Sequence, residues 1–186
     1  MEAPIWIKNL SSTAPAPARE LAFRQLLKEW HRPIYRYCRR MLFSHEDADD
    51  VTQETFIQVS KSVDSIRHEA AFSNWLYRIA HRKCLDHLAK TKRSKIFNPD
   101  ATSESHDMQL ARLESDPWFV GDEAEKKLHA SIHSLPPRQK EVFVLRYFED
   151  MGYAEMAQIL SLSEGSLKAS YHHAVQKIKR HINLSD

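Results

Sequence analysis

YAEMAQILSLSEGSLKASYHHAVQKIKRHI, residues 153–182, places two helical segments on either side of a short turn. Residues 153–160 have the apolar spacing of a short amphipathic helix, and residues 161–163 form the turn. Residues 164–182 form a longer helix that is rich in cations and hydroxyls. Two helices joined in this way are typical of the helix-turn-helix motif, whose second helix enters the major groove of DNA. The C-terminal part of the chain therefore predicts a DNA-binding module.

The composition of the chain favours helices. Its 186 residues include only 3 glycines and 28% are charged, which suits helical domains better than a sheet with many turns. The formal net charge is +2, but the charges are unevenly distributed. Residues 80–95 are basic and residues 96–125 are acidic. Basic segments around an acidic middle predict two nucleic-acid-facing modules joined by a flexible acidic linker.

No segment has the pattern of a targeting or membrane-spanning sequence. The N-terminus lacks the basic start and apolar run of a signal peptide, and no apolar stretch approaches the ~20 residues needed to cross a bilayer. Cys38 and Cys84 fall on apolar helix faces, where a free thiol behaves as a small hydrophobe. The sequence thus predicts a cytoplasmic protein that does not insert directly into a membrane.

Several helices are predicted in the N-terminal half. Residues 1–18 contain the run APAPA and are expected to form a flexible, irregular N-terminus. A helix follows over residues 19–30, and Pro33 should kink it or open the next one. Ser44 and Asp47 have the spacing of a capping box, in which each side chain accepts a hydrogen bond from an exposed backbone N–H, so a further helix should begin there.

That helix, predicted over residues 45–63, has an acidic and amide-rich side. Negative charge near a helix N-terminus is favoured by the helix dipole, so a solvated helix face is one explanation of this side. The polar side continues past the first turn, however, which the dipole does not explain. The polar side chains are Asp47, Asp50, Gln53, Glu54 and Gln58.

A helix predicted over residues 70–89 carries more aromatic and basic side chains than one apolar stripe can bury. Its expected inward residues are Phe72, Leu76, Ile79, Leu85 and Leu88. The cations of this helix, Arg78, Arg82 and Lys83, can neutralise phosphates. Its aromatic rings can replace the base stacking that is lost when a duplex opens. Packing in the core is the alternative for Phe72, where we favour it, and for Trp75, where both explanations stay open.

The C-terminal half resumes after a predicted linker over residues 93–122, with a short helix at residues 108–113. A helix is expected over residues 122–134. Pro137 suits the first turn of the next helix, and Gly152 is expected to end it.

Three stretches in this order resemble the extracytoplasmic-function group of bacterial sigma factors, within the sigma-70 family. They are DADDVTQETF (47–56), FSNWLYRIAHRKCLDHLAK (72–90), and LPPRQKEVFVLRYFEDMGYAEMAQIL (135–160) running into SEGSLKASYHHAV. The resemblance covers residues 22–182. It implies an all-α fold with two small helical domains, region 2 at residues 19–92 and a helix-turn-helix region 4 at residues 123–186.

The resemblance also implies binding to core RNA polymerase, through a coiled coil of its β′ subunit and through its β flap. Carboxylates and amides suit Arg and Lys on a partner helix, with an aromatic side chain as an anchor. The implied polymerase-binding residues are Asp47, Asp50, Val51, Gln53, Glu54 and Phe56.

The second stretch resembles the part that recognises and melts the −10 promoter element, and residues 65–71 correspond to the loop that captures an unstacked base. The implied −10 residues are Ser73, Asn74, Trp75, Tyr77, Arg78, Arg82 and Lys83.

The last helix resembles the reader of the −35 element, with Ser163 as its N-cap. The group often has a Ser-Arg pair where this chain has Ala169 and Ser170, which implies a different sequence preference. The implied −35 residues are Ser163, Glu164, Gly165, Ser166, Lys168, Ser170, His172, His173 and Lys177.

A promoter-specificity factor of this kind is not an enzyme and needs no metal, cofactor or small-molecule substrate, and an anti-sigma factor commonly controls it. Two alternatives stay open. A stand-alone helix-turn-helix regulator would use the same C-terminal helices. A metal hydrolase would use His129 and His133, which have the spacing of two ligands on one helix but no third ligand in a recognisable motif.

Overall fold

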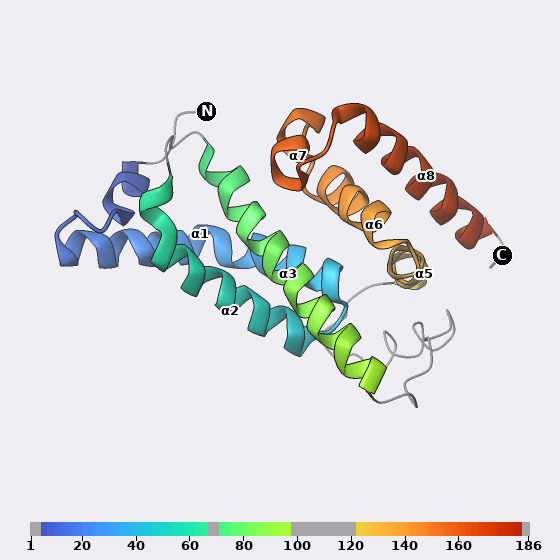
Figure 1. Cartoon of the computed structure of the whole chain (residues 1–186), viewed down its shortest axis with the longest axis horizontal. Helices are drawn as coiled ribbons and strands as arrows, with labels where there is room; N and C mark the ends of the chain where they lie inside the picture. The colour runs from blue at the N-terminus through green and yellow to red at the C-terminus, as the bar shows by residue number, and fades with distance from the viewer. Residues whose placement is uncertain (1–4, 67–70, 98–121, 184–186) are drawn as a thin grey trace. The chain divides into compact units, whose positions relative to one another are not determined.

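The computed structural model describes residues 5–66, 71–97 and 122–183, and every regular element in these ranges is helical (Figure 1). The chain divides into two compact units, Met1–Ala89 and Lys90–Asp186. The all-α fold with two small helical domains is therefore confirmed. The short helix predicted at residues 108–113 lies outside the described residues.

The first unit packs three long helices around one core. Its elements are η1 (Ile5–Leu10), α1 (Ala16–Leu42), α2 (His45–Ser62), η2 (Val63–Ser65) and α3 (Phe72–Phe97). The fully buried side chains come from α1, α2 and α3 alike, and they include Leu26, Ile34, Tyr37, Met41, Val51, Val59 and Leu76. Cys38 and Cys84 are buried free thiols, as the sequence predicts.

The N-terminal part of this unit differs from the sequence prediction at residues 5–10, and at Pro33 it excludes the second of the two expected outcomes, a new helix. Residues 5–10 form a packed 3-10 helix instead of an irregular tail, because Ile7 and Leu10 are buried. Helix α1 continues through Pro33, which lacks the N–H that would bond one turn back. Ile34 and Tyr37 follow directly and are fully buried, so their packing compensates for the missing hydrogen bond.

Helix α2 begins where the sequence predicts. Ser44 Oγ accepts a hydrogen bond from the backbone N–H of Asp47 at 3.2 Å, which is one half of the expected capping box. On the inner face, the buried hydroxyls of Thr52 and Thr55 donate to the carbonyl oxygens of Ala48 and Val51, at 2.6 and 2.7 Å. These bonds satisfy the two polar groups, so α2 packs on its neighbours without an unpaired hydroxyl.

The second unit is a compact set of shorter helices around an apolar centre. Its elements are α5 (Glu123–His133), α6 (Pro137–Phe143), a π-helical turn η4 (Val144–Phe148), α7 (Tyr153–Leu160) and α8 (Glu164–Asn183). Asp122 caps α5 by accepting from the N–H of Glu125 at 2.9 Å, and Pro137 occupies the first turn of α6 as predicted.

The expectation that Gly152 ends the preceding helix is wrong. Gly152 has φ −67° and is the N-cap of α7, where its N–H donates to the carboxylate of Glu155 at 2.8 Å. The left-handed residue after η4 is Asp150, with φ 50°. Aspartate tolerates this conformation better than most residues, so the reversal needs no glycine.

Candidate functional site

The outer side of α2 presents the predicted acidic row to solvent. Asp50, Gln53 and Glu54 are exposed, and Asp47 is half-exposed. Val51 and Phe56, which were predicted to bind the same partner, are only 2% and 5% exposed and support the helix from its inner side. The polymerase-binding prediction therefore falls on two different faces of α2.

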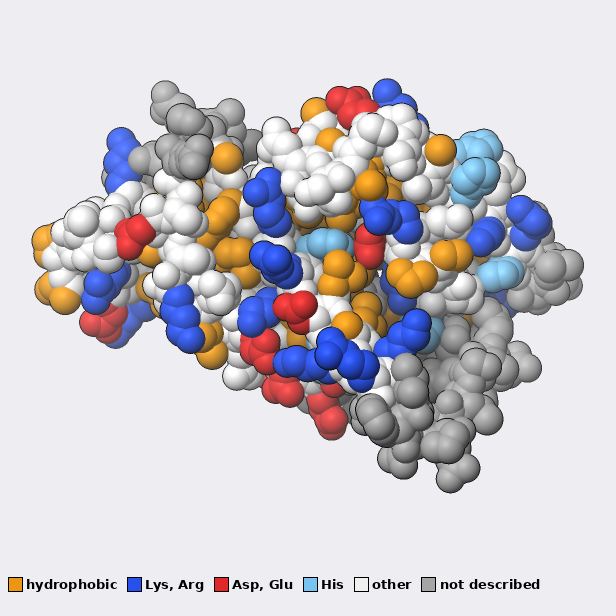
Figure 2. Space-filling view, in the orientation of Figure 1, with side chains coloured by type: hydrophobic (Ala, Val, Ile, Leu, Met, Phe, Trp, Pro, Cys, Tyr) orange, Lys and Arg blue, Asp and Glu red, His pale blue; other side chains and the backbone are white. Residues whose placement is uncertain are grey.

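Two carboxylates of this row pair with cationic or imidazole groups of α3. Glu54 lies 3.2 Å from Lys83 Nζ, and Asp47 lies 3.3 Å from His87 Nε2. The four side chains are between 27% and 50% exposed, and exposed pairs of this kind contribute only ~0.2–1 kcal/mol each. A partner can thus replace either contact at little cost. Figure 2 shows Lys and Arg side chains gathered over α3 with acidic side chains beside them.

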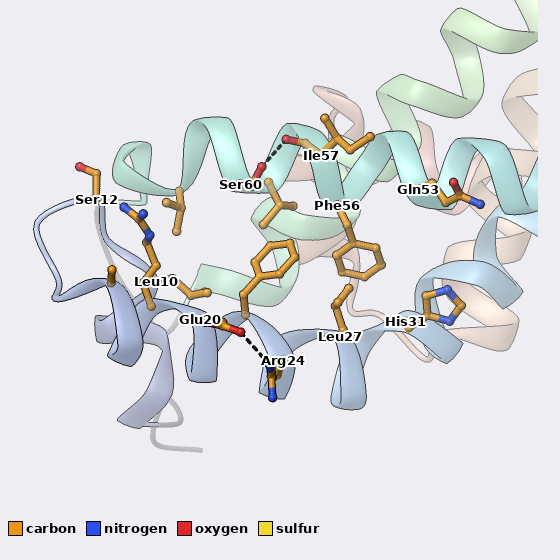
Figure 3. Close-up of a pocket in the computed structure, with 15 residues that line it drawn as sticks. Leu10, Ser12, Glu20, Arg24, Leu27, His31, Gln53, Phe56, Ile57 and Ser60 are labelled. Carbon is orange, nitrogen blue, oxygen red and sulfur yellow. Dashed lines mark hydrogen bonds and ion pairs between the residues drawn. The ribbon is translucent and has the colours of Figure 1, made fainter.

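An apolar groove of about 1010 Å³ runs between α1 and α2, next to the acidic row. Figure 3 shows Leu27 and Phe56 pointing toward one another at its floor, while Gln53 lies at one end. Ile57 lines the groove and is 54% exposed, which is unusual for a large aliphatic side chain. The outer side of α2 therefore offers carboxylates, an amide and apolar surface in one place.

Helix α3 carries the predicted −10 residues on more than one face. Arg78 and Arg82 are exposed, whereas Lys83 is partly covered and pairs with Glu54. Ser73, Asn74 and Trp75 are half-buried in the first turn. The ring of Trp75 leans on Phe72, with a centroid distance of 5.9 Å, and so keeps part of its surface accessible.

Tyr77 does not lie where the sequence prediction needs it. It is 5% exposed and meets Tyr37 edge to face at a centroid distance of 5.4 Å. The hydroxyl of Tyr37 in turn lies 3.0 Å from Nδ1 of the buried His81. The buried side of α3 therefore includes Tyr77, and Leu85, which was predicted to face inward, is 37% exposed instead.

Asp64 in η2 and Phe72 at the start of α3 have contacts that sequence reasoning missed. Trp6 packs edge to face on Phe72, the first residue of α3, at a centroid distance of 5.6 Å. The carboxylate of Asp64, in η2, accepts hydrogen bonds from Ser11 Oγ at 3.1 Å and from the N–H of Ser12 at 2.8 Å. The signal was the apolar run IWI before the proline-rich stretch, which marks a segment that packs.

The helix-turn-helix of the second unit has the predicted bounds almost to the residue. Ser161 takes the left-handed conformation at the end of α7, with φ 56°. Ser163 then caps α8, because its Oγ accepts from the N–H of Ser166 at 3.3 Å. On the inner side of α8, Leu167 and Ala174 are fully buried, which fixes the orientation of the opposite, polar side.

That polar side contains the predicted −35 residues. Lys168 lies 3.8 Å from Glu164 one turn earlier and 5.5 Å above the ring of Tyr153 in α7. A Cβ added at Gly165 would meet nothing within 4 Å, so the fold itself does not require glycine there. Ser170 and Lys177 are half-buried, and the exposed members are Ser163, Glu164, Gly165, Ser166, Lys168, His172 and His173.

The histidines proposed as metal ligands have other surroundings. His129 lies against Phe148, with a centroid distance of 6.2 Å. Within residues 5–66, 71–97 and 122–183, no group of three or more His, Cys, Asp or Glu side chains is placed to hold a metal ion. In the same ranges, no helix has the length and apolar character needed to cross a membrane.

Comparison with known families assigns both units. The family profile Sigma-70 region 2 matches residues 26–94, and the profile Sigma-70, region 4 matches residues 125–178. The ECF RNA polymerase sigma factor SigW of Bacillus subtilis is 26% identical over 166 residues, which cover 87% of this chain and 89% of that protein. The chain belongs to the extracytoplasmic-function group of the sigma-70 family.

Other sigma factors show a similar extent of likeness. The RNA polymerase sigma-H factor of Pseudomonas aeruginosa is 29% identical over 164 residues, 86% of this chain and 85% of that protein. The sigma factor RpoE of Bartonella quintana, solved with the anti-sigma factor NepR, has a TM-score of 0.73 and 18% identity, covering 88% of this chain and 98% of its own. CnrH, solved with the cytosolic domain of CnrY, has a TM-score of 0.69 and 22% identity, with 98% and 97% covered. The two structures support the fold.

Proposed function

We propose that this sigma factor binds core RNA polymerase through the outer side of α2 and directs promoter-specific initiation through α3 and α8. One observation carries the proposal: exposed Asp50, Gln53 and Glu54 stand beside an apolar groove, on a helix whose inner face is packed. Carboxylates and amides suit cations on a partner helix, and the groove adds apolar contact area. A protein that binds DNA by itself has no use for such a surface.

The partner that fits α2 is a helix of the β′ coiled coil. Its Arg and Lys side chains bind Asp50 and displace Lys83 from Glu54, while an apolar side chain enters the groove beside Ile57. In the second unit, Tyr147 is 55% exposed and stacks on Phe143 at a centroid distance of 5.1 Å, so it offers an aromatic anchor for the β flap.

Helix α3 binds the −10 element and opens the promoter. Arg78 and Arg82 are exposed and bind phosphates of the melted strand, and the accessible part of Trp75 stacks on a base. Lys83 also binds phosphate once Glu54 pairs with the polymerase instead. Tyr77 does not contact the promoter, because its ring is buried in the core.

The −35 element is read by the first turns of α8, which lie in the major groove in this docking mode. Lys168 meets a guanine edge or a phosphate, and Lys177 meets a phosphate. The short side chains of Ser166 and Ser170 permit a close approach to base edges. Ser170 supplies no guanidinium, so we expect a −35 preference that differs from that of factors with arginine at this position.

We further propose that an anti-sigma factor holds the protein inactive. RpoE, which shares the fold, was solved with the anti-sigma factor NepR, and CnrH was solved with the cytosolic domain of CnrY. We expect the anti-sigma factor to cover the outer side of α2, because −10 and −35 recognition both depend on the polymerase that binds there.

The test is transcription from a matched promoter by core polymerase with the full-length protein. We expect initiation only when both are present, and Asp50→Lys should weaken core binding about tenfold or more, because a carboxylate contact becomes a repulsive one. Asp86→Lys makes the same charge change at an exposed position of α3 and should leave core affinity unchanged. Undiminished core affinity of Asp50→Lys would refute the docking surface, and tight promoter binding without polymerase would favour a stand-alone regulator.

A further inference from the structure

The aromatic ring of Tyr153, the first residue of α7, is in contact with two cations from other elements of the second unit. Lys168 Nζ of α8 lies 5.5 Å from the ring centre, and Arg146 Cζ of η4 lies 5.6 Å from it. A cation within about 6 Å of an aromatic ring is attracted by the negative face of the ring. The ring therefore links α7 to a side chain of α8 that the proposed function places on the −35 element.

The position of this ring is set by the packing of the second unit. Tyr153 is half-buried, and Met156 and Ile159 hold the inner side of α7 in the core at 0% and 4% exposure. The cation on the η4 side is also held, because the guanidinium of Arg146 donates to the carbonyl oxygen of Met151 at 3.1 Å. The ring is thus a fixed surface that Lys168 meets, and its place does not depend on Lys168.

Lys168 stays accessible in this contact. Its side chain is 60% exposed, whereas the preceding Leu167 is fully buried and fixes the backbone of α8 there. The carboxylate of Glu164 also lies 3.8 Å from Lys168 Nζ, but a carboxylate neutralises the ammonium and repels phosphate. A neutral ring limits the motion of the ammonium and leaves its charge intact, so Tyr153 and Glu164 hold the same lysine with different consequences for DNA.

We propose that Tyr153 is a positioning residue that holds the Lys168 ammonium where it meets the −35 element. A free lysine side chain loses much rotamer freedom when it binds, and the ring removes part of that freedom in advance, so α8 binds the element more tightly. An ammonium has three N–H donors, so the contact with the ring leaves donors for a guanine edge or a phosphate. The inference rests on the proposed function, because it assigns a further residue of this chain to the −35 step.

Two other roles of Tyr153 make different predictions. If the ring only packs α7 against its neighbours, removing it weakens −35 binding by the same factor whether or not Lys168 is present. If the hydroxyl itself binds a phosphate, Tyr153→Phe is as harmful as the loss of the whole ring. A positioning role predicts that the effect of Tyr153 requires the ring and requires the ammonium of Lys168.

The experiment uses the full chain with core polymerase. The −35 ratio is initiation from a matched promoter divided by initiation from the same promoter with a scrambled −35 element. Tyr153→Leu should lower this ratio about two- to fivefold, the range of one exposed cation–π contact, with unchanged core affinity. In the Lys168→Met background the same change should have no further effect, because no ammonium is left to position. Tyr153→Phe keeps the ring and should stay near the wild-type ratio.

Urea unfolding checks that each variant is folded, and Tyr153→Met is a second replacement without a ring if Tyr153→Leu does not fold. An equal loss with and without Lys168 would overturn the inference, as would a loss in Tyr153→Phe that matches Tyr153→Leu. A higher −35 ratio in Tyr153→Leu would also overturn it, because the ring would then hold Lys168 away from DNA. If the wild type itself initiates equally from both promoters, the proposed reading of the −35 element fails instead.

Discussion

The two units place their charges in opposite ways. In the first unit, carboxylates of α2 pair with α3 across the surface, as in Glu54–Lys83 and Asp47–His87. In the second unit, Lys140 and Glu141 are buried in α6, at 8% and 7% exposure, while Lys168 of α8 pairs with Glu164 in its own helix. Another protein can replace a member of an exposed pair, whereas it cannot reach the buried charges.

This difference separates two uses of charge. An exposed pair contributes little to stability, so a binding protein can replace either member, which suits the exchange between inhibitor and polymerase that we propose for this surface. A buried ammonium lowers stability unless its surroundings compensate, and it is not accessible to another protein. We therefore expect pH and mutation to affect the second unit through folding and the first unit through binding.

The largest effect that would test this contrast is expected at Lys140. Burial lowers the pKa of its ammonium to about 8, so the unfolded chain binds this proton more tightly than the folded unit does. The free-energy cost of burying the charged ammonium is fully present below pH 8 and decreases as pH rises toward the ordinary lysine pKa. Stability of the second unit should increase by about 1 kcal/mol between pH 8 and pH 9, measured by urea unfolding.

Lys140→Met removes the ammonium but keeps an unbranched side chain, so it should be more stable than the wild type at pH 7 and should lose the rise above pH 8. Burial raises the pKa of Glu141, whose effect has the opposite sign, because the folded state then holds its proton more tightly and stability falls as pH rises. Glu141→Gln separates the two groups. An unchanged rise in Lys140→Met would mean that Lys140 is not its source.

An intermediate effect is expected at Gly165, on the side of the second unit that remains available for DNA. Because a Cβ meets no atom within 4 Å, Gly165→Ala should stabilise α8 by about 0.5–1 kcal/mol. The same methyl group would stand between the helix and the base edges, so −35-dependent initiation should decrease. The control is the same promoter with a scrambled −35 element, on which the variant and wild type should agree. If Gly165→Ala increased both the stability of the unit and −35-dependent initiation, Gly165 would not contact the DNA.

The smallest effect is expected at the surface pair of the first unit. Glu54→Gln should change the free energy of unfolding by less than ~1 kcal/mol. It should nevertheless release Lys83, so the free protein should bind a single-stranded −10 oligonucleotide more tightly, with a salt slope steeper by up to about 1. Glu164→Gln is the matched change in the second unit, and its effect on this oligonucleotide should be nil. If Glu54→Gln binds no better, the pair does not compete with DNA.

The elements that the sequence predicts well are those set by neighbouring residues. The start of α2 follows from Ser44, and the start of α8 follows from Ser163, because each hydroxyl caps the helix that begins one residue later. The exposed row of α2 was also predictable, since helical spacing alone puts Asp50 and Glu54 on one side. Whether that row binds a polymerase stays a prediction.

The features that were missed depend on residues far apart in the chain. Tyr77 is buried against Tyr37, and spacing within α3 cannot reveal a partner on α1. The packed N-terminal segment depends on Phe72 and Asp64, more than fifty residues away in the case of Ser12. The continuity of α1 through Pro33 is likewise decided by tertiary burial and not by local propensity.

The two back-bonded threonines of α2 have a consequence for the proposed role of α3. Thr52 and Thr55 are fully buried and donate within their own helix, so the inner face of α2 packs in the core that α3 shares. If the polymerase binds the outer face of α2 as proposed, the same packing determines where Arg78 and Arg82 of α3 point relative to the enzyme. The orientation of these two cations would then be set when the complex forms, before the DNA strands separate.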